Sequence, residues 1–438
     1  MTVDTASASV ASAPTYNGDM MAKLASSLND SDQQIWWQKT APLFATVLDS
    51  AKYSPALQQM YLCFHAQTLI PRMGPYPQRF RSAVTRSGLP LEFSVNYQQN
   101  GGVDPTVRIG FEPVGRASGS AEDPYNQIAL DDLLKHLDGL NLKGYSSALF
   151  EHFIDTHTVN AEERVKLEGK KLEGSDLSLS QTAFGFDLKN GTVSVKGYSF
   201  PALKTKATGK GFGQLFEDSI RPLLSSTGPL PSLTTVNKYM EETNGYSDWS
   251  FFSWDCVDPS KTRFKLYSST NEVIWSKVED IWTLGGRFTS ASNLKGLEYL
   301  NRLWHLMKIS EGHRAFTGGF DDGTDATPTP IIWNYEIKAG DSPPVTKLYF
   351  PIHGDSDLVI VQGLAQFLEE IGLVEQGRGY EQTVNRYFPE RDLSKTARLT
   401  SWISFAYTEK TGVYLSVYYH SSVDYPWLEQ EEQERKGQ

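Results

Sequence analysis

Short segments in which a basic residue stands two positions before a tyrosine recur along this 438-residue chain. The pairs are Lys196 and Tyr198, Lys265 and Tyr267, and Lys347 and Tyr349. In a β-strand, side chains two positions apart share a face, whereas Leu266 and Leu348 between the pairs lie on the other face. Each segment therefore predicts a strand with one basic, phenolic face and one apolar face.

The β-type segments are separated along the chain by helical windows. The β-type segments span residues 90–98, 106–113, 184–189, 193–200, 262–268, 346–354 and 412–420. Apolar residues three or four apart predict helices at 55–69, 128–140, 211–224, 233–243, 296–307 and 358–372, and residues 29–31 suit a helix cap.

Two arrangements accommodate these two-faced strands. A sandwich would bury the apolar faces and leave the basic faces in solvent. The recurrent cation–tyrosine face and the interleaved helices favour an α+β fold instead, in which a closed antiparallel barrel has a polar lumen and a surrounding ring of helices. We expect one domain over residues 19–425, between a disordered tail at 1–18 and a charged tail at 426–438.

Composition excludes several classes of protein. A net charge of −11 argues against nucleic-acid binding, and only two cysteines, Cys63 and Cys256, argue against a disulfide framework. The chain contains no run of about 18 apolar residues, so the sequence predicts no membrane-spanning helix. Its N-terminus lacks the pattern of a secretory signal. We therefore expect a cytoplasmic monomer or homodimer that does not bind membranes.

A lumen that holds both cations and phenols suits one kind of chemistry. Arginine and lysine in a walled cavity favour a multiply charged anion such as a diphosphate. Electron-rich tyrosine faces attract a cation. Heterolysis of an allylic diphosphate needs both, because an anion leaves while an allyl cation forms.

A metal is not expected at this site. Asp321, Asp322 and Asp325 match a DDxxD pattern, but the surrounding glycines and prolines exclude the helix that would align their carboxylates. The chain contains no P-loop, HExxH or GxSxG motif, and no GxGxxG in a strand–helix context. We predict no metal and no cofactor.

Glu92 is the sharpest candidate for catalysis. It shares a predicted strand face with Ser94 and Asn96, while Leu91 and Phe93 lie on the other face. A carboxylate in the lumen would accept the N–H of a bound indole and assist the later proton loss. The alternative is an exposed glutamate on an edge strand.

Longer motifs in matching order resemble the fungal indole prenyltransferases of the dimethylallyltryptophan synthase type, from about Trp36 to about His420. They are GPYP (74–77), SGLPLEFSVNYQ (87–98), RIGFEPV (108–114), VKGYSFPALK (195–204), RFKLY (263–267), WTLGG (282–286), KLYFPIHG (347–354) and SFAYTEKTGVYLSVYYH (404–420). The resemblance implies the αββα (ABBA) barrel, dimethylallyl diphosphate as donor, and catalysis without metal.

The resemblance also implies a role for particular residues. Glu92 would hold the indole nitrogen. The diphosphate ligands would be Arg108, Lys196, Arg263, Lys265 and Lys347. A shield around the allyl cation would be formed by Tyr198, Tyr267, Tyr349, Tyr414 and Tyr418.

Further sequence motifs resemble one branch of this family and bear on the acceptor. The motifs GPYPQRFRS (74–82), YMEETNGY (239–246) and PIIWNYEI (330–337) are similar to enzymes that attach a reverse dimethylallyl group to brevianamide F, the cyclic dipeptide of tryptophan and proline. Relatives that act on free tryptophan carry a lysine where this chain has Gln181, Thr182 and Ala183. The resemblance thus implies a tryptophan-containing cyclic dipeptide and reverse prenylation at indole C2 or C3. A tryptophan or tyrosine prenyltransferase, and a non-catalytic barrel that binds an anionic amphiphile, are the alternatives.

Overall fold

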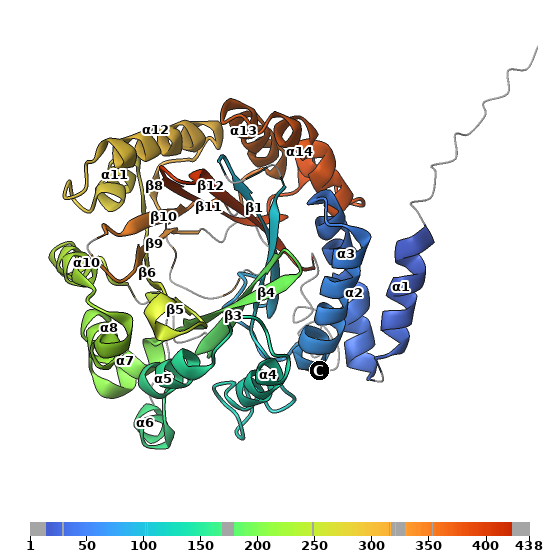
Figure 1. Cartoon of the computed structure of the whole chain (residues 1–438), viewed down its shortest axis with the longest axis horizontal. Coiled ribbons are helices and arrows are strands. Elements are labelled where there is room, and N and C mark those ends of the chain that lie inside the picture. The colour runs from blue at the N-terminus through green and yellow to red at the C-terminus, as the bar shows by residue number, and fades with distance from the viewer. Residues whose placement is uncertain are drawn as a thin grey trace, which may run out of the picture.

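In the part of the chain that the structure describes, ten antiparallel strands close into a barrel that helices surround (Figure 1). This computed structural model describes residues 15–28, 30–100, 102, 104–168, 179–247, 249–314, 316, 320, 329–340, 342–352 and 354–422. Among them, no helix is both long and apolar enough to cross a membrane. The closed barrel with its ring of helices confirms the predicted fold class.

The barrel strands are β1 Leu91–Gln98, β2 Thr106–Phe111, β3 Thr182–Lys189, β4 Thr192–Ser199, β5 Phe251–Asp255, β6 Phe264–Thr270, β9 Ile331–Ile337, β10 Val345–Tyr349, β11 Thr400–Thr408 and β12 Gly412–His420. Around the barrel their order is β1-β12-β11-β10-β9-β6-β5-β4-β3-β2. Pairing of β1 with β12 closes the barrel, so the first and last strands lie side by side (Figure 1). The short β7 Glu272–Val273 and β8 Gly312–His313 pair outside it.

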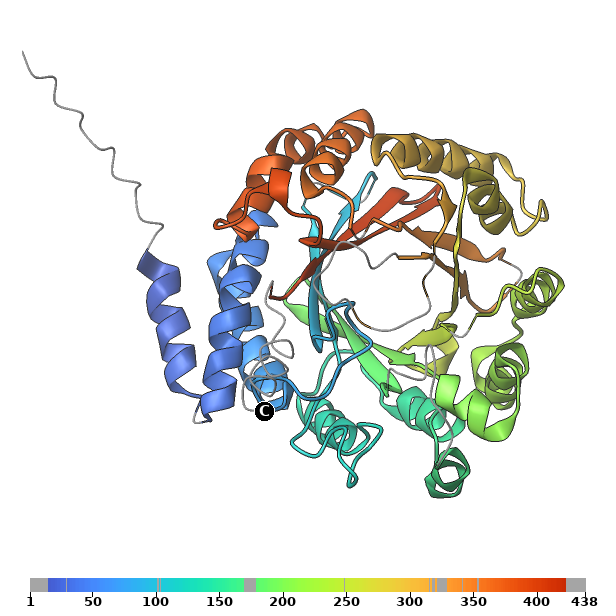
Figure 2. The same ribbon diagram turned by 180° about the vertical axis from the view of Figure 1, so that it is seen from behind.

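The surrounding helices come between pairs of strands along the chain, and the view from behind shows the same ring (Figure 2). They are α1 Thr15–Ser26, α2 Ser31–Ser50, α3 Pro55–Phe64, α4 Ile128–Gly139, α5 Ala148–His157, α6 Ala161–Leu167, α7 Ala202–Thr208, α8 Phe212–Ile220, α9 Leu224–Thr227, α10 Pro231–Glu242, α11 Trp275–Thr283, α12 Ala291–Leu306, α13 Asp357–Glu370 and α14 Val374–Tyr387. Asp30 caps α2 by accepting hydrogen bonds from backbone N–H groups of its first turn, which confirms the predicted cap.

The core lies between the outer face of the barrel and the helices. Phe93 of β1 stacks on Phe44 of α2, with ring centroids 4.9 Å apart. Phe184 of β3 stacks on Phe150 of α5 at 4.5 Å. Each buried aromatic side chain of this kind contributes about 1.5–3 kcal/mol to folding. Because the apolar faces point outward to the helices, the polar faces line the lumen, as the strand alternation predicts.

The structure differs from the sequence-based expectations at the N-terminus and in the number of barrel strands. α1 begins at Thr15, so the end of the expected tail at residue 18 lies inside a helix. Residues 1–14 and the expected tail at 426–438 lie outside the described residues. Three barrel strands, β5, β9 and β11, were not predicted from the sequence.

Candidate active site

A cavity of about 430 Å³ occupies the barrel lumen. All eleven residues that the sequence singles out line it. They are Glu92, Arg108, Lys196, Tyr198, Arg263, Lys265, Tyr267, Lys347, Tyr349, Tyr414 and Tyr418. Residues from strands far apart in the sequence therefore meet in one enclosed space.

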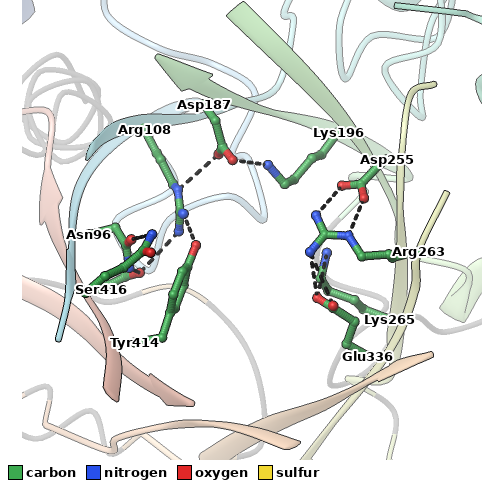
Figure 3. A network of polar contacts seen from close by, with 11 residues as sticks. Asn96, Arg108, Asp187, Lys196, Asp255, Arg263, Lys265, Glu336, Tyr414 and Ser416 are labelled. Atoms are coloured by element: carbon green, nitrogen blue, oxygen red, sulfur yellow. Dashed lines mark hydrogen bonds and ion pairs between the residues drawn. The ribbon is translucent and has the colours of Figure 1, made fainter. Parts of the chain in front are cut away.

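Basic and acidic side chains alternate across neighbouring strands on one part of the cavity wall (Figure 3). We call this set the charge cluster, and its members are Arg108, Asp187, Lys196, Asp255, Arg263, Lys265, Glu336 and Lys347. Five of the eight are basic and three are acidic, so the cluster retains an excess of positive charge. A multiply charged anion would neutralise that excess.

On one side of the charge cluster, Asp187 joins two cations. Its carboxylate lies 3.1 Å from Arg108 Nε and forms an ion pair with Lys196 Nζ. Burial would raise the pKa of Asp187, but Arg108 and Lys196 outweigh that effect and hold it well below its usual range. The guanidinium of Arg108 also donates to the hydroxyl groups of Tyr414 and Ser416 (Figure 3). These bonds fix the orientation of Arg108 before any ligand arrives.

On the other side, Arg263 bridges two carboxylates. Its Nε lies 2.6 Å from Asp255 Oδ2, and its Nη1 lies 3.2 Å from Glu336 Oε1. Lys265 Nζ is 3.8 Å from Glu336 Oε2. Burial lowers the pKa of Lys265. For Lys347, burial together with repulsion from Arg108 and Lys265 lowers the pKa well below its usual value. A bound anion would relieve this destabilisation of both ammonium groups.

The three carboxylates are residues that sequence reasoning missed. Asp187 lies in a predicted strand, two positions after Gly185, which is opposite the lumen residue Lys196. Strand alternation alone could therefore have placed Asp187 in the lumen. Asp255 and Glu336 lie on β5 and β9, two of the strands that were not predicted. Their register opposite Lys196 and Lys265 gives each carboxylate a basic cross-strand partner.

Four tyrosines form a continuous row beside the charge cluster. We call Tyr198, Tyr267, Tyr349 and Tyr418 the tyrosine row, in which neighbouring ring centroids are 6.3, 6.2 and 6.0 Å apart. Burial raises the pKa of each phenol, so the rings are neutral near pH 7. Their faces offer the electron density that stabilises a cation.

Tyr414, the fifth predicted tyrosine, lies apart from this row. Lys347 Nζ is 4.7 Å from the centroid of its ring, and Arg108 Cζ is 5.2 Å away. Tyr414 therefore belongs geometrically with the basic groups, where its ring and hydroxyl already contact two of them.

Glu92 is buried inside the barrel wall. It lies on β1 between β2 and β12, so the alternative of an exposed glutamate on an edge strand is wrong. The Ser401 hydroxyl donates to Glu92 Oε1 at 2.6 Å. Gly110 lies opposite on β2, and a Cβ there would approach Glu92 Oε2 to 3.9 Å. Burial raises the pKa of Glu92 to about 8, although the hydrogen bond from Ser401 lowers it.

The rest of the cavity wall is largely aromatic and apolar. Its large side chains include Phe200, Trp249, Phe251, Phe316, Phe320 and Trp402. Outside the charge cluster, Arg86 and Glu92 are the charged side chains among the described residues that line the cavity. The guanidinium of Arg86 lies 4.6 Å from the centroid of the Phe316 ring. This part of the cavity suits an uncharged aromatic molecule.

The DDxxD aspartates, Asp321, Asp322 and Asp325, lie outside the described residues. Within the described ranges, no three His, Cys, Asp or Glu side chains are grouped so that they could hold a metal ion.

Comparison with known proteins agrees with this geometry. Residues 32–383 match the family described as tryptophan dimethylallyltransferase. The chain is 58% identical over 423 residues to prenyltransferase phqI of Penicillium fellutanum. The aligned region covers 92% of this chain and 91% of that protein. It is 42% identical over 408 residues to deoxybrevianamide E synthase notF of Aspergillus sp. (strain MF297-2), with 91% and 90% covered.

A solved structure shares the fold. The crystal structure of NotF in complex with brevianamide F and DMSPP is similar at a TM-score of 0.80 and 38% identity, over 91% of this chain and 96% of that chain. The match to the family, the close relatives and the shared barrel agree: this chain is a prenyltransferase of the tryptophan dimethylallyltransferase family.

Proposed function

We propose that this protein transfers a dimethylallyl group from dimethylallyl diphosphate to the indole of a tryptophan-containing cyclic dipeptide such as brevianamide F. One observation carries the proposal: the five basic residues of the charge cluster, the tyrosine row and Glu92 line a single cavity whose remaining wall is largely aromatic and apolar. A relative with the same fold is solved with brevianamide F and DMSPP.

Ionisation of the donor is the task of the charge cluster and the tyrosine row. Arg108, Lys196, Arg263, Lys265 and Lys347 hold the diphosphate, and Tyr414 contributes its hydroxyl. The bond between C1 and oxygen breaks, and its electron pair stays on the departing diphosphate. Buried cationic side chains supply the stabilisation that a metal would otherwise provide, so we propose that the reaction proceeds without metal. The tyrosine row surrounds the allyl cation and excludes water.

Attack by the indole is the task assigned to Glu92. In its ionised form the carboxylate accepts the indole N–H, which raises the electron density of the ring. A ring carbon forms the new bond to the allyl cation. Attack at C2 ends with loss of the proton from that carbon to Glu92 or to water, whereas at C3 the N–H proton is lost. We propose reverse attachment, through the tertiary carbon of the allyl cation, at C2 or C3.

The charges of the cavity favour a cyclic dipeptide over a free amino acid. Free tryptophan or tyrosine carries an ammonium and a carboxylate, each of which needs a buried partner. A cyclic dipeptide has no net charge, and its amide groups need only hydrogen bonds. Ala183, opposite Tyr198 on the neighbouring strand, lines the cavity. It lies in the segment where the family resemblance implies a lysine in enzymes that act on free tryptophan.

A panel of acceptors tests this assignment. The protein is incubated with dimethylallyl diphosphate and brevianamide F, other tryptophan cyclic dipeptides, a cyclic dipeptide without tryptophan, tryptophan or tyrosine. We expect one added C5H8 unit on the tryptophan cyclic dipeptides, and NMR of the product to show a reverse prenyl group at C2 or C3. Faster turnover of free tryptophan or tyrosine would contradict the proposal.

The alternative of a non-catalytic barrel that binds an anionic amphiphile is overturned by the match to the tryptophan dimethylallyltransferase family and by the prenyltransferases that this chain resembles over nine-tenths of its length.

A further inference from the structure

Asn334 is a buried polar side chain in the cavity wall whose hydrogen-bonding groups are not used. It lies on β9, is 1% exposed and lines the cavity. Among the described residues, neither its Oδ1 nor its Nδ2 has a hydrogen-bond partner. Buried carboxamides are normally hydrogen-bonded, and an unsatisfied one destabilises the folded protein. Such a group facing a cavity indicates a ligand that satisfies it.

The strand register places Asn334 at the boundary between the charge cluster and the tyrosine row. Asn334 pairs with Lys347 on β10 and with Tyr267 on β6. Glu336, a member of the charge cluster, follows two positions later on the same face of β9. At this boundary the diphosphate would end and the dimethylallyl group would begin.

A neutral donor suits this position better than another cation. Lys347 already lies close enough to Arg108 and Lys265 for these charges to repel one another. A carboxamide adds a hydrogen bond to the anion without adding to that repulsion.

On the basis of the proposed function, we propose that Asn334 binds the departing diphosphate of the prenyl donor. Nδ2–H of Asn334 donates to the oxygen that bridges C1 and the α-phosphorus, and Oδ1 accepts from the ammonium of Lys347. As the C1–O bond breaks, the electron pair remains on that oxygen and its negative charge grows. The hydrogen bond therefore strengthens in the transition state, so Asn334 contributes to kcat as well as to donor binding.

Asn334→Leu tests the proposal because leucine has a similar volume and leaves no polar atom unsatisfied. We expect the ligand-free variant to unfold at the same temperature as wild type or a higher one. We expect kcat to fall about 10- to 100-fold and the Kd for inorganic pyrophosphate to rise about tenfold, as for loss of a hydrogen bond to a charged group. Exchange of ¹⁸O between the bridging and non-bridging positions of the donor, which follows ionisation directly, should slow with kcat.

Asn237→Leu provides the matched control. Asn237 is also buried, but on α10 its Nδ2 donates to Glu217 and its Oδ1 accepts from Tyr246. This variant should lower the unfolding temperature and leave donor kinetics unchanged.

Two results would overturn the role of Asn334. The first is an Asn334→Leu variant that matches wild type in pyrophosphate affinity and isotope exchange. The second is a loss of stability equal to that of Asn237→Leu, which would identify a structural asparagine. Pyrophosphate binding needs no acceptor, so it tests Asn334 even if the acceptor panel fails and refutes the proposed function.

Discussion

Glu92 is the residue whose protonation state decides whether the cavity can activate an indole. Burial raises its pKa to about 8, so at pH 7 much of the ligand-free protein carries the neutral acid. In the proposed mechanism, Glu92 is active in its ionised form, the carboxylate. Activity should therefore be lost as the pH falls through this pKa, and not as it rises.

The pH dependence of kcat/KM for the acceptor, measured at saturating donor, tests this role. We expect kcat/KM to increase with pH and to level off above about pH 8. Glu92→Gln should lower it by about 10²- to 10⁴-fold, the range of general acid–base catalysis, and should abolish the acidic limb. An unchanged acidic limb in the variant would assign the titration to another group.

The same substitution has a predictable effect on stability. A carboxyl group whose pKa is raised by folding stabilises the native state only at low pH, and this contribution is lost as the pH rises through about 8. Glu92→Gln removes the group. The unfolding temperature of the variant, compared with wild type, should therefore rise between pH 6 and pH 9.

At the scale of elements, the segment before β1 covers part of the cavity and is held by one buried carboxylate. Within this segment, residues 83–86 line the cavity. Glu112 accepts hydrogen bonds from Ser82, from Ser180 at 2.6 Å and from Asn126 at 2.9 Å. Ser180 in turn accepts from the backbone N–H of Ala83 at 2.8 Å. Glu112 thus fixes a segment that would contact the acceptor.

Glu112→Ala should affect acceptor binding through this segment. It leaves buried donors without their acceptor, each at a cost of about 1–3 kcal/mol, so we expect a lower unfolding temperature. We also expect a several-fold higher KM for the acceptor with little change in donor KM. Glu163→Ala is the control, because Glu163 is also buried but pairs with Lys204. Equal acceptor KM values for Glu112→Ala and Glu163→Ala would show that Glu112 acts on stability alone.

How much the sequence predicts differs from element to element. Strand alternation correctly placed Lys196, Tyr198, Lys265 and Glu92 in the lumen, because a period of two fixes the face of a side chain whatever its partner strand. Helices with a clear apolar stripe, such as α13, were also predicted. β5, β9 and β11 were missed, and with them the order of strands around the barrel, which local sequence does not reveal.

Interactions that depend on strand register were beyond sequence reasoning. Asp255 faces Lys196 across two strands that are far apart in the chain. The hydroxyl of Ser401, on β11, reaches Glu92 on β1 across β12, which lies between their strands, and the sequence does not reveal this strand order. Asn334 shows no sequence signal of its own, since its unused amide becomes apparent only when all neighbouring side chains are placed.

At the scale of the whole molecule, closure of the barrel makes the chemistry possible. Pairing of β1 with β12 brings Glu92 beside the strand that carries Tyr414 and Tyr418. The helices cover the apolar outer face of the barrel, and the polar inner face lines the cavity. We propose that the five basic residues of the charge cluster take the place of a metal.

Product formation in the presence of EDTA tests whether the reaction needs a metal. The protein is incubated with dimethylallyl diphosphate and brevianamide F, with EDTA or with added magnesium, and the product is quantified by mass spectrometry. We expect the same C5H8-bearing product, at a similar rate, in both conditions. Activity that disappears in EDTA and returns with magnesium would contradict it.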